Sequence, residues 1–308
     1  MRAISRRHLL QTGVAAGLSL CLRPPALLAA AEPLIQRKIP SSGESLPVVG
    51  IGTAGGGYEA VTTDAARASL KEVLHRFQEI GGRVVDTAPS YGTAEAVVGD
   101  LVSGLGIRGS LFLATKVEGR RGEAGIEEVE QSFKRLRTTM IDLIAVHNLQ
   151  DTANQLATLR RYKREGRIRY VGITTSFPRQ YSDFERTMKA ESLDFIQVDY
   201  ALDNRTAAER ILPLAADRGM AVMINLPFGR RRLFQAVRGR ALPAWAAEFE
   251  CRSWAQFFLK YVVSHPAVTC AIPGTANASH VADNLAAARG RLPDMSMRRR
   301  MEEFIDAL

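Results

Sequence analysis

The stretch Ile141-Asp142-Leu143-Ile144-Ala145-Val146-His147 is a short, nearly continuous apolar run that ends in a histidine. Apolar runs of about four to eight residues, without strict alternation, are typical of strands buried on both faces of a parallel sheet. Seven further runs of this kind cover residues 47–52, 83–86, 111–116, 170–173, 195–200, 221–225 and 269–273. The sequence therefore predicts eight parallel strands.

Amphipathic segments alternate with these runs. Residues 64–80 place Leu70, Val73, Leu74 and Phe77 at the spacing of one helix face. Comparable helical patterns cover residues 126–140, 153–164, 180–190, 207–218, 253–265 and 278–288. Strand–helix units repeated over about 250 residues are typical of a (β/α)8 TIM barrel.

We therefore expect a single-domain α/β fold, a (β/α)8 barrel, over residues 32–308. Residues 34–46 precede the first strand and are expected to form a hairpin that closes the barrel floor. Residues 295–308 are expected to form a C-terminal helix. The alternative is an open, doubly wound sheet, which requires a G-x-G-x-x-G turn after its first strand. Gly55-Gly56-Gly57 lies near that point but lacks the spacing.

Residues 1–31 have the order of a cleavable export signal. Arg6-Arg7 precedes an uncharged stretch at 12–22, and Ala29-Ala30-Ala31 offers a cleavage site before Glu32. Paired arginines indicate the twin-arginine pathway. We therefore predict a twin-arginine signal peptide, transient contact with the twin-arginine translocase, and a periplasmic or otherwise exported protein without a stable membrane anchor. An alanine-rich tail and lipidation at Cys21 are the alternatives.

Charge and cysteine content argue against a nucleic-acid-binding protein and against a fold held by a disulfide framework. Without residues 1–31 the chain has 37 basic and 32 acidic residues, a net charge of +5. A mild excess without a clustered basic face does not indicate nucleic-acid binding. Cys251 and Cys270 remain in this part of the chain, and two cysteines do not make a disulfide framework. The sequence does not decide whether they pair.

Ionisable residues follow three neighbouring strands at the point where each strand ends. Asp86 ends the second strand, with Tyr91 in the loop after it, Lys116 ends the third and His147 ends the fourth. Because functional residues of barrels gather at the carboxyl ends of the strands, we expect these four side chains to meet at the mouth. Each alone has a structural explanation, such as capping or packing, but four together favour a catalytic site.

The four residue types suit the reduction of a carbonyl group, in which the oxygen that gains negative charge needs a proton. Tyrosine is a weak acid near neutral pH, and a nearby ammonium such as Lys116 lowers its pKa. Asp86 can hold Lys116 charged, and His147 can donate a hydrogen bond to the carbonyl. A hydrolase would need a carboxylate pair or a metal cluster at the mouth. The sequence shows neither, so no metal site is predicted.

The segment Asp86-Thr87-Ala88-Pro89-Ser90-Tyr91-Gly92, followed by Glu95 and Gly99, resembles the D-T-A-x-x-Y-G-x-x-E-x-x-x-G signature of the aldo/keto reductase family. Ala114-Thr115-Lys116 resembles that family's lysine strand, and 142–147 its histidine strand. The resemblance implies that Tyr91 is the proton donor, that Lys116 and Asp86 tune it, and that His147 orients the substrate.

The resemblance also implies a nicotinamide cofactor bound without a Rossmann unit, with NADP(H) favoured over NAD(H). The segments 50–53, 172–176, 195–198 and 272–275 resemble the family's cofactor-contacting strands. The residues implied to bind the cofactor are Gly52, Thr53, Thr174, Thr175, Gln197, Asn225, Gly274, Thr275, His280 and Asn284.

Several cofactor positions depart from the family pattern. Thr175 replaces an amide, and Asn225 stands where an aromatic ring commonly stacks on the nicotinamide, with Phe228 in the loop beyond. His280 stands where many members have a more basic residue for the 2′-phosphate, and histidine is a weaker, pH-dependent anion partner. Arg230–Arg232 follow strand 7, where they can either hold phosphate or be solvated.

The leading interpretation is an NAD(P)H-dependent reductase of a small-molecule aldehyde or ketone. The alternative is a non-catalytic nucleotide-binding sensor or subunit on the same scaffold, favoured by the altered nicotinamide contacts. Export raises the question of how reduced cofactor is supplied outside the cytoplasm.

Overall fold

The computed structural model describes residues 32–55, 57–119 and 123–308. The proposed signal peptide and Cys21 lie outside the described residues. Within the described part of the chain, no helix is both long and apolar enough to cross a membrane.

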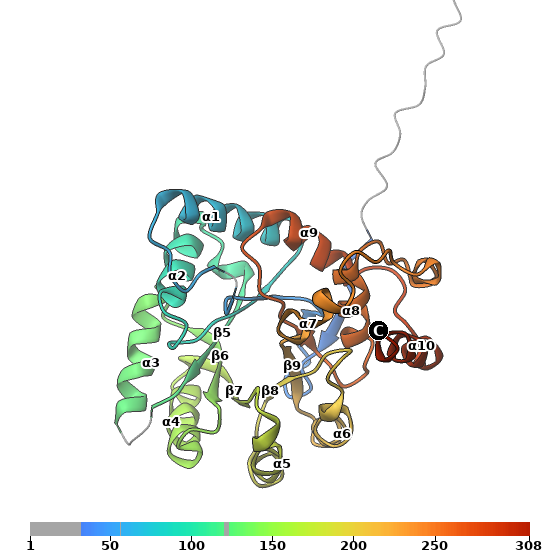
Figure 1. The fold of residues 1–308 in the computed structure, drawn as a ribbon. Coiled ribbons are helices and arrows are strands. Elements are labelled where there is room, and N and C mark those ends of the chain that lie inside the picture. The colour runs from blue at the N-terminus through green and yellow to red at the C-terminus, as the bar shows by residue number, and fades with distance from the viewer. Residues whose placement is uncertain (1–31, 56, 120–122) are drawn as a thin grey trace, which may run out of the picture. The chain divides into compact units, whose positions relative to one another are not determined.

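Eight parallel strands form the centre of the domain (Figure 1). They are β3 (Ile51–Gly52), β4 (Val84–Asp86), β5 (Phe112–Val117), β6 (Ile141–His147), β7 (Ile168–Thr174), β8 (Phe195–Asp199), β9 (Ala221–Asn225) and β10 (Cys270–Ala271), and each pairs with its neighbours in chain order. Parallel bridges from Val49 to Ala271 and from Gly52 to Gly274 join the first strand to the last. The sheet is thus closed into the predicted (β/α)8 barrel, and the open-sheet alternative is wrong.

Glycine permits the closure at the first strand. A Cβ atom on Gly52 would lie 2.8 Å from the carbonyl oxygen of Ile272, and one on Gly50 would lie 2.7 Å from that of Val84. Both contacts are closer than a side chain tolerates. The predicted bounds of β6 and β9 agree with the structure, whereas β3 and β10 have shorter regular ladders than predicted because their mutual pairing consists of single bridges.

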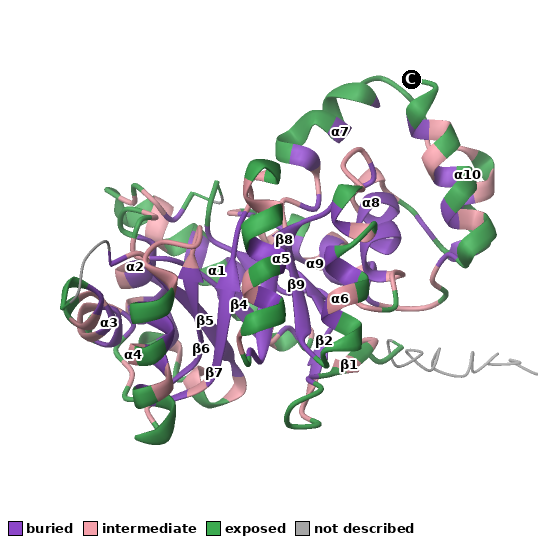
Figure 2. Cartoon of the chain, turned by 90° about the horizontal axis from the view of Figure 1, so that it is seen from below, coloured by how far each residue is buried: buried purple, intermediate pink, exposed green. Residues whose placement is uncertain are grey.

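Helices cover the outside of the barrel (Figure 2). They are α1 (Asp64–Glu79), α2 (Ala94–Leu105), α3 (Ala124–Arg135), α4 (Thr152–Arg164), α5 (Tyr181–Ala190), α6 (Ile211–Asp217), α7 (Arg232–Ala236), α8 (Trp254–Val263), α9 (Ala278–Ala286) and α10 (Met295–Asp306). The C-terminal helix is confirmed as α10. The helix predicted for 126–140 ends at Arg135, because Arg137 takes a left-handed backbone conformation.

Sequence patterns did not identify α2. Seven of its twelve residues are buried, so it lacks the polar stripe of an amphipathic helix. Two glycines, Gly99 and Gly104, lower its helix propensity further. The short α7 also went unpredicted, and α6 begins at Ile211, later than the predicted residue 207.

A hairpin of β1 (Gln36–Lys38) and β2 (Ser45–Pro47) closes the floor, as predicted. Ile39 and Leu46 are fully buried and join the cluster inside the barrel that includes Phe112 and Phe195. Cys270 belongs to the same cluster, and Cys251 is buried elsewhere; both are free thiols, so they do not pair.

Candidate active site

A buried ion pair lies at the mouth of the barrel. The Nζ atom of Lys116, on β5, is 2.7 Å from Oδ2 of Asp86, on β4, and donates a second hydrogen bond of 2.8 Å to the carbonyl oxygen of Thr87. Burial alone would lower the pKa of Lys116, but the negative charge of Asp86, followed by the influence of Tyr91, raises it above the ordinary value. The side chain is therefore held as an ammonium ion.

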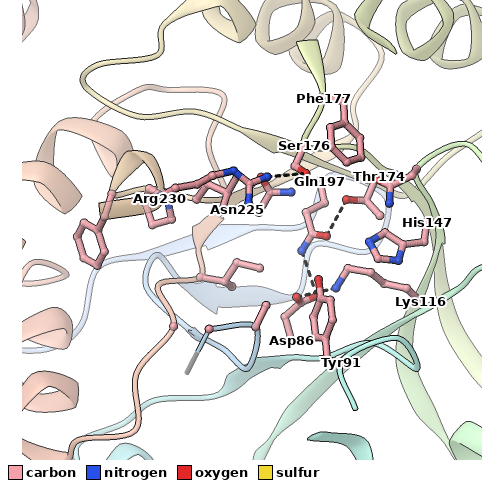
Figure 3. A pocket seen from close by; sticks show the side chains of 18 of the residues that line it. Asp86, Tyr91, Lys116, His147, Thr174, Ser176, Phe177, Gln197, Asn225 and Arg230 are labelled. Atoms are coloured by element: carbon pink, nitrogen blue, oxygen red, sulfur yellow. Dashed lines mark hydrogen bonds and ion pairs between the residues drawn. The ribbon is translucent and has the colours of Figure 1, made fainter. Parts of the chain in front are cut away.

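Tyr91 lies against this ammonium ion. Nζ of Lys116 is 5.0 Å from the centre of the Tyr91 ring, and the rings of Tyr91 and His147 meet edge to face with their centres 6.1 Å apart. Figure 3 shows the four side chains close together; Asp86, Lys116 and His147 come from β4, β5 and β6, and Tyr91 comes from the loop after β4. All four predicted catalytic residues are thus brought together.

Lys116 lowers the pKa of Tyr91, as the sequence predicts, but burial outweighs this effect. Burial raises the pKa of Tyr91 above its ordinary value, and the charge of Lys116 opposes this shift without reversing it. The phenol is consequently protonated at neutral pH. The positive charge of Lys116 would stabilise the phenolate that forms when Tyr91 loses its proton.

His147 has a partner that the sequence analysis missed. Its Nδ1 lies 2.5 Å from Oε1 of Glu118, which follows the last residue of β5. Burial, followed by repulsion from Lys116, lowers the pKa of His147, and attraction to Glu118 offsets only part of this change. Glu118 is a polar residue at a strand end, so the rule that found Asp86, Lys116 and His147 also pointed to it.

A hydrogen-bonded row links the ion pair to the next strands. Nε2 of Gln197 donates to Oδ1 of Asp86 over 3.0 Å, and Oγ1 of Thr174 donates to Oε1 of Gln197 over 2.8 Å (Figure 3). Both side-chain groups of Gln197 are therefore engaged within the protein, which fixes the orientation of its amide.

These side chains line a cavity of about 550 Å³, a size usual for sites that bind small ligands. Eight of the predicted site residues line it: Asp86, Tyr91, Lys116, His147, Thr174, Gln197, Asn225 and Gly274. Residues that the predictions did not include also contribute, among them Asn148, Ser176, Phe177, Leu226 and Pro227. These come from loops, where sequence patterns carry little positional information.

Three predicted cofactor residues near the mouth do not line the cavity. The Thr175 hydroxyl donates to Oε1 of Gln180 and accepts from the backbone N–H of Phe177, so the next residue, Ser176, reaches the cavity instead. Thr53 is buried and donates to Thr87, and Gly52 serves the barrel closure.

The remaining predicted cofactor residues lie on α9 and just before it. Oγ1 of Thr275 and Nδ1 of His280 are 3.5 Å apart, and Asn284 lies one turn further along the same helix. None of these three lines the cavity, whereas the neighbouring Gly274 does. The structure thus places them as a separate group beside the β10 end of the mouth.

The three arginines after β9 have different surroundings. Arg230 and Arg231 line the cavity, and Arg230 donates to Oγ of Ser176 over 3.4 Å. Arg232 instead forms an ion pair of 2.9 Å with Asp203. Arg230 and Arg231 both take left-handed backbone conformations, with φ of 52° and 73°, which is uncommon for residues other than glycine.

Comparison with known proteins identifies the family. The model of the aldo/keto reductase family matches residues 48–305. Methylglyoxal reductase YeaE from Escherichia coli strain K12 is 32% identical over 262 residues, which cover 82% of this chain and 89% of that protein. The NADH-specific methylglyoxal reductase of the same organism is 29% identical, with 68% of this chain and 73% of that protein covered. The chain therefore belongs to the aldo/keto reductase family.

Solved structures share the fold. An aldo-keto reductase from Klebsiella pneumoniae in complex with NADPH has a TM-score of 0.73 at 24% identity, covering 89% of this chain and 95% of that one. The holo form of aldo-keto reductase AKR11C1 from Bacillus halodurans has a TM-score of 0.72 at 23% identity, covering 88% and 96%.

Proposed function

We propose that this protein reduces an aldehyde or ketone to an alcohol, with hydride from a bound nicotinamide cofactor and a proton from Tyr91. The observation that carries this proposal is the position of Tyr91, which lies beside a buried ammonium ion that Asp86 keeps charged. A proton donor needs an acid form that persists before the reaction and a conjugate base that is stabilised after it.

Tyr91 meets both requirements for a proton donor. Burial keeps the phenol protonated, because it raises the pKa. When the carbonyl carbon has gained a hydride, its oxygen takes the Tyr91 proton, and the electron pair of the broken O–H bond remains on the phenolate. Lys116 then faces an opposite charge at short range in a site largely shielded from water, where such attraction is strong.

The cavity fits a nicotinamide cofactor, which when bound supplies the hydride. Oδ1 of Asn225 is buried without a hydrogen-bond partner among the described residues, while its Nδ2 donates to the carbonyl oxygen of Thr175 over 3.2 Å. A carboxamide N–H would satisfy this acceptor. Arg230 and Arg231 suit the phosphates at the same rim. Asn225 thus offers a polar contact where the family commonly places an aromatic ring.

The named relatives guide the proposal for the cofactor type and the substrate. One structural relative binds NADPH, whereas one sequence relative is named as NADH-specific. We favour NADPH, with Thr275, His280 and Asn284 at the adenine end, and NADH as the alternative. Two relatives are named methylglyoxal reductases, so methylglyoxal is the first substrate to test.

A non-catalytic nucleotide-binding sensor is the second candidate. The observation that favours it is the engagement of Gln197, whose amide is satisfied by Asp86 and Thr174 rather than left open for a ligand. A sensor would bind NADPH without oxidising it in the presence of any carbonyl compound.

We further propose that residues 1–31 direct export by the twin-arginine pathway, with cleavage before Glu32. Replacement of Arg6 and Arg7 by lysine should retain the protein in the cytoplasm, as followed by fractionation and mass analysis of the N-terminus. A mature protein that begins before residue 32, or that reaches the periplasm without the arginines, would contradict this proposal.

The decisive test of the catalytic function is NADPH oxidation by the purified protein with methylglyoxal and with an aromatic aldehyde. Tyr91→Phe should reduce turnover by about 10²–10⁴-fold, the usual contribution of a general acid. Tyr58→Phe is the matched control, because Tyr58 is a buried tyrosine that lies outside the cavity lining and has a hydroxyl without a partner among the described residues. Unchanged turnover in Tyr91→Phe would exclude the mechanism, and cofactor binding without turnover would favour the sensor.

A further inference from the structure

Glu118 and His147 meet at the outer wall of the cavity. His147 lines the cavity, whereas Glu118 does not; it lies on the other side of the ring, with Glu127 and Glu128 of α3. The backbone N–H groups of Glu118 and Gly119 both donate to Oε2 of Glu128, over 3.0 and 2.8 Å. The segment that presents Glu118 is therefore held in place from behind.

The contact fixes where the ring carries its proton. An ionised carboxylate can only accept a hydrogen bond, and a neutral imidazole carries one proton on one of its two nitrogens. With Nδ1 of His147 2.5 Å from the Glu118 oxygen, a lone pair on Nδ1 would face a negative charge, so the proton belongs on Nδ1. The nitrogen left for the cavity, Nε2, then has a lone pair and accepts.

We propose that Glu118 is a positioning residue that holds the proton of neutral His147 on Nδ1, so that His147 can donate from Nε2 to a substrate oxygen only as an imidazolium ion. This inference rests on the proposed carbonyl reduction and deepens it, because it specifies the protonation state that the reaction requires. It also gives this site a pH dependence that a ring protonated on Nε2 would not have.

The surroundings of His147 determine where this dependence falls. The groups that face the ring are Lys116 from β5 and Glu118 just after it, Asp86 and Tyr91 from β4 and its loop, and uncharged Thr174, the pairing partner of His147 on β7. Burial and Lys116 lower the pKa of His147, which Glu118 and Asp86 only partly restore. The neutral ring therefore predominates at neutral pH, and kcat/KM for carbonyl reduction should fall as pH rises above this pKa.

The test combines Glu118→Gln with the control Glu127→Gln. A glutamine amide can donate to an unprotonated Nδ1, so Glu118→Gln permits the ring to carry its proton on Nε2. Glu127 belongs to the same acidic group but is exposed on α3 and does not contact the ring. Nitrogen NMR of histidine-labelled protein, assigned by the loss of the signal in His147→Gln, reports which nitrogen is protonated.

We expect Nδ1 protonation at pH 7.5 in the native protein and in Glu127→Gln, and a gain of Nε2 protonation in Glu118→Gln. The native kcat/KM should fall roughly tenfold per pH unit above the pKa of His147, as for one required proton, and Glu118→Gln should flatten this fall. Nε2 protonation in the native protein, or the same pH slope in Glu118→Gln, would overturn the proposal. The NMR result needs no turnover, so it decides the role of Glu118 even if carbonyl reduction is not observed, and the protonation site in the native protein tests the proposal even if Glu118→Gln does not fold.

Discussion

Nζ of Lys116 and Oδ2 of Asp86 lie 2.7 Å apart at a depth where the side chains are only 2% and 7% exposed. Removing two charges from water costs several kcal/mol for each ion, and their attraction recovers this only when the geometry is good. The remaining contacts supply that geometry, because the carbonyl oxygen of Thr87 accepts a second hydrogen bond from Lys116 and the amide of Gln197 donates to the other oxygen of Asp86. The pair is therefore a unit whose members depend on each other.

This dependence predicts a non-additive mutant cycle. Lys116→Met alone leaves Asp86 buried without its counter-charge, and Asp86→Asn alone does the same to Lys116, so each should lower the free energy of unfolding by about 3–5 kcal/mol. The double variant removes both charges and should be more stable than either single variant. Urea unfolding of the four proteins measures this cycle. Losses that simply add would show that the two charges do not support each other.

The family signature around Asp86 contains structural positions as well as chemical ones. Glu95 is buried, accepts from Thr115 over 2.6 Å and pairs with Arg135 over 2.7 Å. Gly99, one turn further along α2, lies where a Cβ atom would be 2.1 Å from the carbonyl oxygen of Arg135. The signature thus joins α2 to the end of α3 while it supplies Asp86 and Tyr91 to the site.

Replacing each of two glycines of α2 with alanine should consequently change the free energy of unfolding in opposite directions. Gly99→Ala forces a methyl group against backbone and should lower the free energy of unfolding by about 1–3 kcal/mol or more. A Cβ atom on Gly104 of the same helix meets nothing within 4 Å. Gly104→Ala should therefore raise the free energy of unfolding by about 0.5–1 kcal/mol through helix propensity. Denaturant titration compares the two, and equal effects would exclude the proposed packing role of Gly99.

Sequence patterns predicted the parts of this protein in which one periodicity dominates. Strands such as β6 and β9 are buried on both faces, so their apolar runs have clear ends. The search for polar residues at such strand ends identified Asp86, Lys116 and His147. The pattern failed for α2, which is buried too widely to show a polar stripe. It also failed in loops, where Ser176 rather than Thr175 reaches the cavity because Gln180 holds the Thr175 hydroxyl. Such hydrogen bonds depend on backbone geometry that periodicity does not encode.

The arginines after β9 provide a test of the cofactor proposal. Arg230 lines the cavity and pairs with no carboxylate in the part of the chain that the structure describes, whereas Arg232 is neutralised by Asp203. Arg230→Ala should weaken NADPH binding roughly tenfold at low salt and reduce its salt dependence. Arg232→Ala should leave the Kd within about twofold, because its charge is already compensated. Fluorescence titration at two salt concentrations measures both, and equal losses would place the phosphates elsewhere.

His265, remote from the site, should govern part of the acid stability. Its Nδ1 accepts the backbone N–H of Ala267 over 3.3 Å, and burial, followed by repulsion from Arg298 and Arg37, lowers its pKa to about 4. The unfolded chain binds this proton near the ordinary value of 6.5, whereas the folded protein does not, so the unfolded state holds more protons between about pH 4 and 6.5. The free energy of unfolding should therefore fall as pH decreases through this window.

His265→Asn removes the titrating group while leaving an oxygen that can accept the Ala267 N–H. The variant should lose less stability than the native protein between pH 7 and pH 4.5, as measured by urea midpoints at both values. His75→Asn, on the exposed side of α1, is the control and should keep the native difference between the two pH values. If His265→Asn shows the full native difference, the acid sensitivity belongs to other groups, and the buried histidine is protonated as readily in the folded state as in the unfolded chain.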